Sequence, residues 1–132
     1  MKGKFIVLLI SFATLISACS KDKRKLVGWW AIDVIRIGDA NRLVYLSVNS
    51  MVFDNNGEVS LPRYDFKGSE NGTWEIEKDE DDRYLVIKSS NNILARRYRL
   101  FYFKDPKNKV YRMSLQSDSI VMVCTKGLQV YH

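Results

Sequence analysis

Short segments in which apolar and polar residues alternate fill most of the chain beyond residue 26. A period of two places successive side chains on opposite faces of a strand, which is typical of strands with one buried face. Turn residues rather than helical repeats separate these segments. The pattern predicts eight strands, over residues 28–37, 43–53, 58–62, 72–78, 84–88, 94–103, 109–116 and 119–126.

The connections between these segments are short and rich in turn residues. Asn56-Gly57 is a strong hairpin signal, because this pair tolerates the positive φ values of tight turns. A polar loop is expected over 63–71, and turns over 79–82 and 89–92. The sequence therefore predicts an all-β fold, an eight-stranded antiparallel up-and-down barrel, because closure removes the free edges of a sheet. Such an interior is filled by side chains or holds one small ligand.

Residues 1–18 have the features of a bacterial secretion signal. Lys2 and Lys4 are followed by an apolar segment over 5–16, which is too short to span a bilayer comfortably, and then by small residues. Ile16-Ser17-Ala18-Cys19 resembles the lipobox of bacterial lipoproteins. The resemblance implies cleavage before Cys19, acylation of its thiol and amine with chains such as palmitate, and a stable membrane anchor.

The resemblance also divides the chain into a signal peptide over 1–18, the lipidated Cys19 with a solvated tether over 19–25, and a barrel domain over 26–132. Ser20 follows the cysteine where an Asp would favour the inner membrane, so the outer membrane of the cell envelope is the expected location. The cations of the tether either contact anionic lipid headgroups or keep the segment extended and soluble.

Charge and candidate chemistry remove two function classes. The chain carries a formal charge of +6. The leader contributes +2 of this and residues 21–25 contribute +3, so that residues 26–132 carry only +1. This near-neutral domain argues against binding to nucleic acid.

Catalysis is not expected either. The one histidine is the last residue, His132, and no catalytic triad, metal-ligand spacing or glycine-rich phosphate loop is present. Asp79, Asp81 and Asp82 lack the glycine and distal glutamate of a calcium-binding loop, so a charged turn without metal is expected. With Cys19 lipidated, Cys124 has no disulfide partner, and its apolar neighbours predict a buried, inert thiol.

Three motifs in order resemble the lipocalins. Leu26-Val27-Gly28-Trp29-Trp30 contains their Gly-x-Trp signature, and Phe53-Asp54-Asn55-Asn56-Gly57 with Gly72-Thr73-Trp74 is similar to small lipocalin-like lipoproteins of Bacteroidetes. The resemblance implies a calycin-type barrel with Trp30 across its closed end. Two features depart from the family: the Thr-Asp-Tyr loop motif is missing, and Lys126 stands where lipocalins place an Arg over the tryptophan. Lys126 is expected to be solvated, and the alternative is a weaker cation–π contact with the ring. Small β domains of some periplasmic stress proteins, which open with Leu-x-Gly-x-Trp, are the alternative fold.

The strand over 94–103 mixes cations and aromatic residues on both faces. If Tyr98 and Tyr102 point inward, Arg96 lies near the barrel rim, where it could meet a ligand carboxylate. In the alternative interpretation, Arg97 and Arg99 pair with acidic residues on a neighbouring outer face. The aromatic residues of the chain either fill the core or line a pocket. The candidate ligand-binding residues inside the barrel are Trp30, Ile32, Phe53, Trp74, Arg96, Tyr98 and Tyr102.

Two functions follow from these features. The first is a membrane-anchored lipocalin-like protein that binds a small hydrophobic or amphipathic ligand without a cofactor. It predicts an internal cavity of roughly 300 Å³ or more, open at the end away from Trp30. The second is an interaction module, a subunit or inhibitor, that binds an envelope protein. It predicts a filled barrel and an exposed apolar patch.

Overall fold

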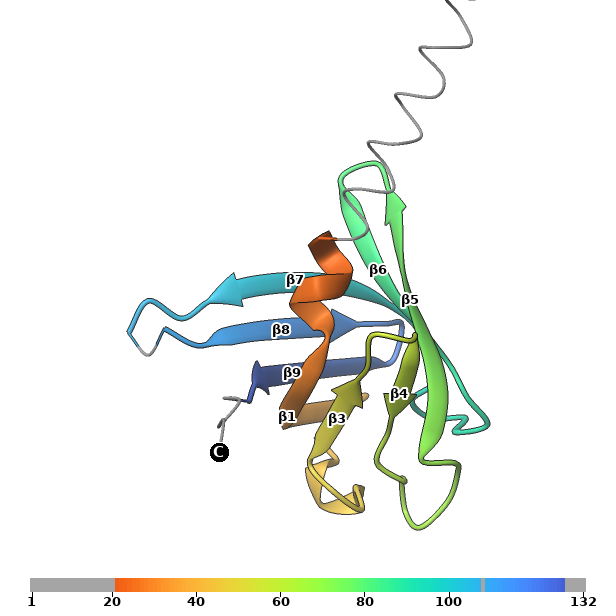
Figure 1. Cartoon of the computed structure of the whole chain (residues 1–132). Coiled ribbons are helices and arrows are strands. Elements are labelled where there is room, and N and C mark those ends of the chain that lie inside the picture. Colours follow the sequence, from red (N-terminus) through yellow and green to blue (C-terminus); the bar gives the residue numbers. More distant parts are fainter. Residues whose placement is uncertain (1–20, 108, 128–132) are drawn as a thin grey trace, which may run out of the picture.

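The computed structural model describes residues 21–107 and 109–127. Their strands form one antiparallel sheet in which each strand pairs with the next, and β1 also pairs with β9, so that eight strands close into a barrel (Figure 1). The predicted up-and-down barrel is therefore confirmed. Its strands are β1 (Gly28–Ile37), β3 (Ser50–Phe53), β4 (Glu58–Ser60), β5 (Asn71–Asp79), β6 (Asp82–Lys88), β7 (Arg97–Lys104), β8 (Tyr111–Gln116) and β9 (Ile120–Lys126).

Strand β2 (Ala40–Asn41) is a two-residue extension that pairs with the end of β1. The leader, the lipobox and Cys19 lie outside the described residues. Within the described ranges, no helix is long and apolar enough to cross a membrane.

Alternation along the strands builds the core, with one interruption. Trp30 and Ile32 point inward as predicted, but a β-bulge between Ile32 and Val34 shifts the register. After the bulge Ile35 is fully buried and Val34 only partly, so the inward face no longer follows the period of two set by Trp30 and Ile32. A bulge adds one residue to a strand and reverses the alternation beyond it, which a strict period of two cannot anticipate.

The strand predicted over 43–53 is shorter than expected. Only β3, Ser50–Phe53, pairs in the barrel, and the 3-10 helix η1 (Leu43–Tyr45) and a loop precede it. Met51 and Phe53 are buried, whereas Tyr45 lies outside and stacks on Tyr64 at a centroid distance of 5.6 Å. Leu43 packs against the core and Tyr45 against the neighbouring loop, so both are apolar although neither lies in a strand.

The structure explains why glycine stands at two positions of the sequence motifs, Gly28 and Gly72. Gly28 has a φ of 133°, a conformation that side chains rarely adopt. A Cβ atom on Gly72 would lie 2.7 Å from the carbonyl oxygen of Lys88 on the neighbouring strand. Both positions thus need glycine for the backbone to close the barrel.

A helix over residues 21–26 covers one end of the barrel, called here the closed end. This differs from the predicted solvated tether. Leu26 is fully buried and its carbonyl oxygen accepts a hydrogen bond of 2.7 Å from Nε1 of Trp30. Asp22 is also buried and pairs with Arg83 of β6 at 2.5 Å. The sequence did not predict this helix, because Leu26 is its only apolar residue and its other residues are charged. Trp30 lies at the closed end, as the resemblance implies.

Three segments, 38–49, 61–70 and 89–96, meet at the opposite end, called here the mouth. Leu46, Leu61 and Leu94 come from one segment each and belong to the hydrophobic core. Buried Asn91 ties two of the segments together. Its Nδ2 donates to the carbonyl oxygen of Pro62 at 2.9 Å, and its Oδ1 accepts from the backbone N–H of Leu94 at 3.1 Å. Side chains from all three segments therefore pack together at the mouth.

Replacing Asn91 tests this closure. Asn91→Ala leaves the Pro62 carbonyl and the Leu94 N–H without their partner inside the protein, and we expect it to lower the free energy of unfolding by about 2 kcal/mol. Urea unfolding followed by tryptophan fluorescence measures the change. Asn92→Ala, at the exposed neighbour, is the matched control and should change it by less than about 0.5 kcal/mol. Equal effects of the two variants would contradict the role of Asn91.

Candidate functional site

Five of the seven candidate ligand-binding residues meet inside the barrel. Trp30, Ile32, Phe53, Trp74 and Tyr98 are buried members of one hydrophobic core. The rings of Phe53 and Trp74 meet edge to face at 5.5 Å, and the hydroxyl of Tyr98 donates to the carbonyl oxygen of Leu94 at 2.8 Å. Burial raises the pKa of Tyr98 far above its ordinary value, so this phenol stays neutral.

The other two candidates lie at opposite ends of the barrel. Arg96 stands at the rim of the mouth, where its Nε donates to the carbonyl oxygen of Ile93 at 2.8 Å. Tyr102 lies at the closed end and donates to the carbonyl oxygen of Asp22 at 3.3 Å. The seven residues therefore do not form one binding site.

The outward arginines of β7 follow the alternative interpretation. Arg97 pairs with Glu77 at 3.0 Å, and Arg99 pairs with Asp82 at 2.8 Å. Both pairs are solvent-exposed. Arg99–Asp82 joins the neighbouring strands β7 and β6, and Arg97–Glu77 reaches across β6 from β7 to β5. They contribute little to stability but neutralise this part of the wall.

Side chains occupy the barrel interior. Met113, Leu115 and Met122 from β8 and β9 are fully buried against the aromatic core. Cys124 lies among them, and burial raises the pKa of its thiol to about 12. This thiol is therefore protonated at neutral pH, and its predicted burial is confirmed. The two surface features described next lie outside this packed core.

A groove of about 440 Å³ lies at the closed end, between helix 21–26 and the hairpin of β7 and β8. We call it the closed-end groove. Its aromatic wall consists of Trp30, Tyr102, Phe103 and Tyr111. Its remaining lining residues are all cationic: Arg24, Lys25, Lys104 and Lys126.

Each of three lysines in this groove faces an aromatic ring. Lys126 lies 5.7 Å from the Trp30 ring centroid, Lys104 lies 5.7 Å from that of Tyr111, and Lys25 lies 5.8 Å from that of Tyr102. Within residues 21–107 and 109–127, none of these three lysines forms a salt bridge with a carboxylate. Among the described residues, these three lysines therefore bring their positive charge to the groove without a paired carboxylate.

Lys126 is not the solvated terminal lysine that the sequence predicts. Its ammonium group donates to the carbonyl oxygen of Lys25 at 2.8 Å and faces the Trp30 ring, and partial burial lowers its pKa. The prediction failed because helix 21–26, which supplies the acceptor, was expected to be an extended tether.

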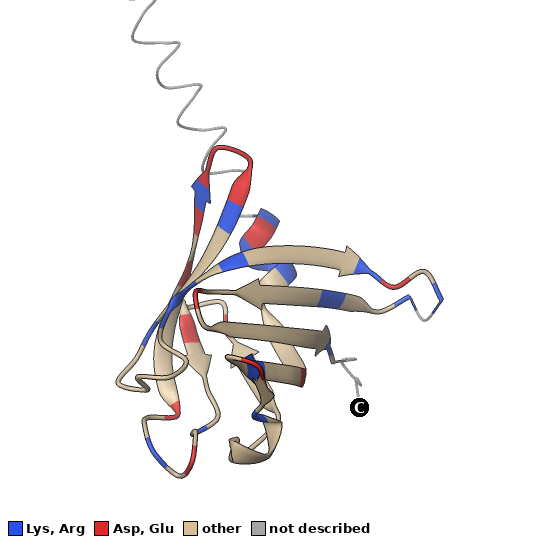
Figure 2. Ribbon diagram, turned by 180° about the vertical axis from the view of Figure 1, so that it is seen from behind, with Lys and Arg blue, Asp and Glu red and all other residues tan. Residues whose placement is uncertain are grey.

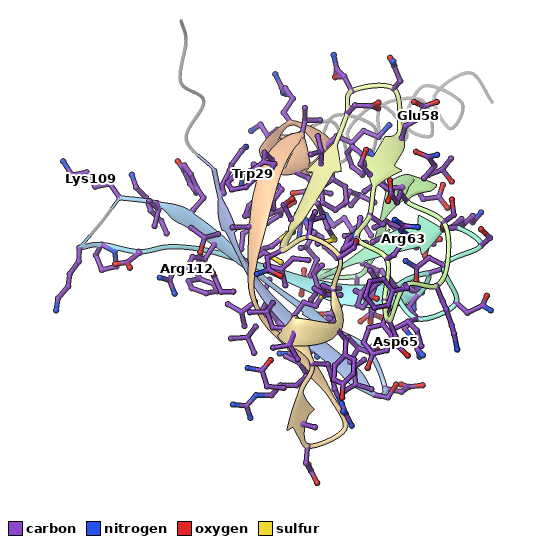
Figure 3. All side chains as sticks on the ribbon, turned by 90° about the horizontal axis from the view of Figure 1, so that it is seen from below. Trp29, Glu58, Arg63, Asp65, Lys109 and Arg112 are labelled. Carbon is purple, nitrogen blue, oxygen red and sulfur yellow. The ribbon has the colours of Figure 1, made fainter. Side chains whose placement is uncertain are left out.

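The mouth carries exposed apolar side chains, Val44, Tyr45, Val48 and Phe66, which we call the mouth patch. Segments 38–49 and 61–70 hold it together, since the backbone N–H of Asp65 donates to the carbonyl oxygen of Tyr45 at 2.8 Å. Figure 3 shows Arg63 and Asp65 of this region on the side of the molecule away from Lys109, which lies near the tip of the β7–β8 hairpin.

Phe66 differs from the rest of this patch, because its side chain is not buried and its backbone conformation is one that phenylalanine does not favour. Its side chain is 88 % exposed, and its φ is 63°. Asp65 before it has a φ of 52°, and the Lys67 N–H donates to the Tyr64 carbonyl at 3.0 Å. Two positive φ values within a hydrogen-bonded turn of four residues favour Asn or Gly at the second position. Sequence reasoning missed this site because phenylalanine is not a turn residue.

Comparison with known proteins adds no assignment. No family model matches the chain, and neither a curated protein nor a solved structure matches it. The candidate sites are therefore judged on their geometry and charge.

Replacing Phe66 tests whether the residue is held against the preference of its backbone. Phe66→Asn places a residue suited to positive φ in the turn, and we expect it to raise the free energy of unfolding by about 1 kcal/mol. Phe101→Asn, at an exposed aromatic in the middle of β7, should have the opposite sign, because aromatic residues favour strands. Urea unfolding of both variants measures this contrast. An unchanged or lower stability of Phe66→Asn would show that the turn does not strain the phenylalanine.

Proposed function

We propose that this protein is a lipid-anchored lipoprotein of the bacterial outer membrane whose lipocalin-like barrel binds another envelope protein through the mouth patch. The signal sequence and lipobox support the anchor. The filled interior supports a function carried by the outer surface. In this proposal the barrel is a rigid support that presents two loops.

Phe66 carries the proposal. A large aromatic side chain in water gains no burial, and a positive φ costs of order 1 kcal/mol. No contact described within the fold offsets either cost, whereas a partner that buries the ring would offset both. Val44, 89 % exposed, lies on the adjoining segment, next in sequence to Tyr45, whose carbonyl oxygen accepts from Asp65.

The chemistry of the mouth patch indicates the kind of partner. Arg42 lies 5.2 Å from the Tyr45 ring centroid, and Lys67 directly follows Phe66 in the turn. A hollow of about 340 Å³ between segments 61–70 and 89–96 lies beside them. The surface therefore suits a protein that offers an apolar pocket for Phe66 and carboxylates for the cations around it.

Storage of a ligand inside the barrel is the alternative function, which the lipocalin resemblance implies. It requires core side chains such as Trp30, Phe53 and Tyr98 to move apart and open a space. A protein interior is close-packed, so each displaced side chain loses its contacts. The interaction module needs no such rearrangement and is therefore preferred.

The anchor is tested by removing the thiol that would carry the acyl chains. In cells, Cys19→Ala is expected to abolish incorporation of labelled palmitate and to leave the protein out of the outer-membrane fraction. Cys124→Ala removes the other thiol and is the matched control, which should remain lipidated. A Cys19→Ala protein that still carries acyl chains would refute the anchor.

The mouth patch is tested by photo-crosslinking in intact cells. With p-benzoylphenylalanine at position 44, we expect one predominant adduct with an envelope protein, reduced at least ten-fold by Phe66→Asn. The same probe at position 121, on the outer face of β9, is the control and should not give that adduct. Equal adducts from the two positions, or an adduct that Phe66→Asn leaves unchanged, would count against the proposal.

A further inference from the structure

The closed-end groove has the size and composition of a ligand site. Its volume of about 440 Å³ falls within the range of roughly 300–1,000 Å³ of small-molecule pockets. Its lining combines flat apolar rings with cations and contains no acidic residue. The groove lies outside the barrel, so it does not require the core to open.

The arrangement of the cations indicates the charge of the ligand. Each lysine ammonium group has three donors. Lys126 uses one of them for the Lys25 carbonyl oxygen, and Lys104 makes only its ring contact in the interactions described above. An acid group entering the groove would find donors from both strands that border it, β7 and β9. A neutral ligand would not pair with the positive charge of these lysines.

The aromatic wall indicates what else the ligand contains. Tyr111 and Phe103 are half-exposed on the β7–β8 hairpin, and Tyr102 lies deeper, against Lys25 of the helix. Burial raises the pKa of Tyr102 far above its ordinary value, so its phenol stays neutral and adds no negative charge. Rings of this kind bury the apolar chain or ring of a ligand.

We infer that the closed-end groove binds an amphiphilic anion, with its single acid group against Lys104 and Lys126 and its apolar part against Tyr102, Phe103 and Tyr111. Such a molecule is either free in solution or a lipid of the surrounding membrane. The inference stands apart from the mouth-patch proposal, because the two surfaces lie at opposite ends of the barrel.

Calorimetry with three probes tests the inference on the chain that begins at Ser20, which retains all described residues. Decanoate supplies the acid group and the chain, decanol the chain alone, and inorganic phosphate the charge alone. We expect saturable 1:1 binding of decanoate, at least ten-fold weaker binding of decanol, and no saturable binding of phosphate. Decanoate binding should weaken as salt is added.

Lys104→Gln is the decisive variant, because it removes a groove cation near the hairpin tip without touching the core. We expect it to weaken decanoate binding about five-fold, the effect of one cation near an anionic group. Lys126→Gln should weaken binding by at least as much. Lys88→Gln, which removes a lysine on the outer face of β6, is the matched control and should leave binding unchanged.

Vesicles separate the two sources of the ligand. If the ligand is a membrane lipid, the same chain binds vesicles that contain phosphatidylglycerol but not vesicles of phosphatidylcholine alone, and Lys104→Gln reduces this binding. Decanoate binding without vesicle binding identifies a free amphiphile, and either result supports the groove. Binding of neither probe, or decanoate binding that Lys104→Gln and Lys126→Gln leave unchanged, overturns the inference. The latter result would instead place the ligand elsewhere, for example inside the barrel.

Discussion

Seven residue pairs join β1 to β9, from Trp30 with Lys126 to Ile37 with Ile120, and close the sheet on itself. Closure pairs the outermost strands of the sheet with each other, and it fixes a diameter that eight strands make just wide enough for side chains to fill. A domain of about a hundred residues has few apolar side chains to spare, and its buried rings, Trp30, Phe53, Trp74 and Tyr98, pack in the core. The same closure that stabilises the fold thus brings these rings together inside the barrel.

The two ends of the barrel are covered in different ways. At the closed end, helix 21–26 contacts both β6, through Asp22 and Arg83, and β7, through Lys25 and Tyr102. At the mouth, three segments are joined by backbone hydrogen bonds and by buried Asn91. A regular helix leaves a groove beside the diverging β7–β8 hairpin, whereas the mouth segments leave loop tips that project. The closed end therefore carries a groove, and the mouth carries projecting loop tips beside a smaller hollow.

Period-two alternation was enough to predict the barrel and most of its strands. It was sufficient for β5, where Trp74 and Ile76 point inward, because no bulge interrupts that strand. It failed where one residue changes the phase, at the bulge after Ile32, and where Tyr45 alternates within a loop. The candidate sites were harder to predict from the sequence, because tertiary packing brings residues as distant as 24 and 126 together in the closed-end groove. The turn at Phe66 could not be predicted for a local reason, because phenylalanine does not favour the positive φ that this turn requires.

The distribution of charge over the surface says more about the possible ligands of this domain than its net charge does. The domain is nearly neutral, yet acidic residues gather at the tip of the β5–β6 hairpin, and cations gather on helix 21–26 and the β7–β8 hairpin (Figure 2). Helix 21–26 contacts both hairpins, so the acidic tip lies on one side of it and the closed-end groove on the other. In the proposal for this groove, one acid group meets its lysines, whereas an anion that extended beyond it would meet the carboxylates of Asp79 and Asp82. The separation of charge therefore limits the proposed site to a compact anion, which the near-neutral sum alone does not indicate.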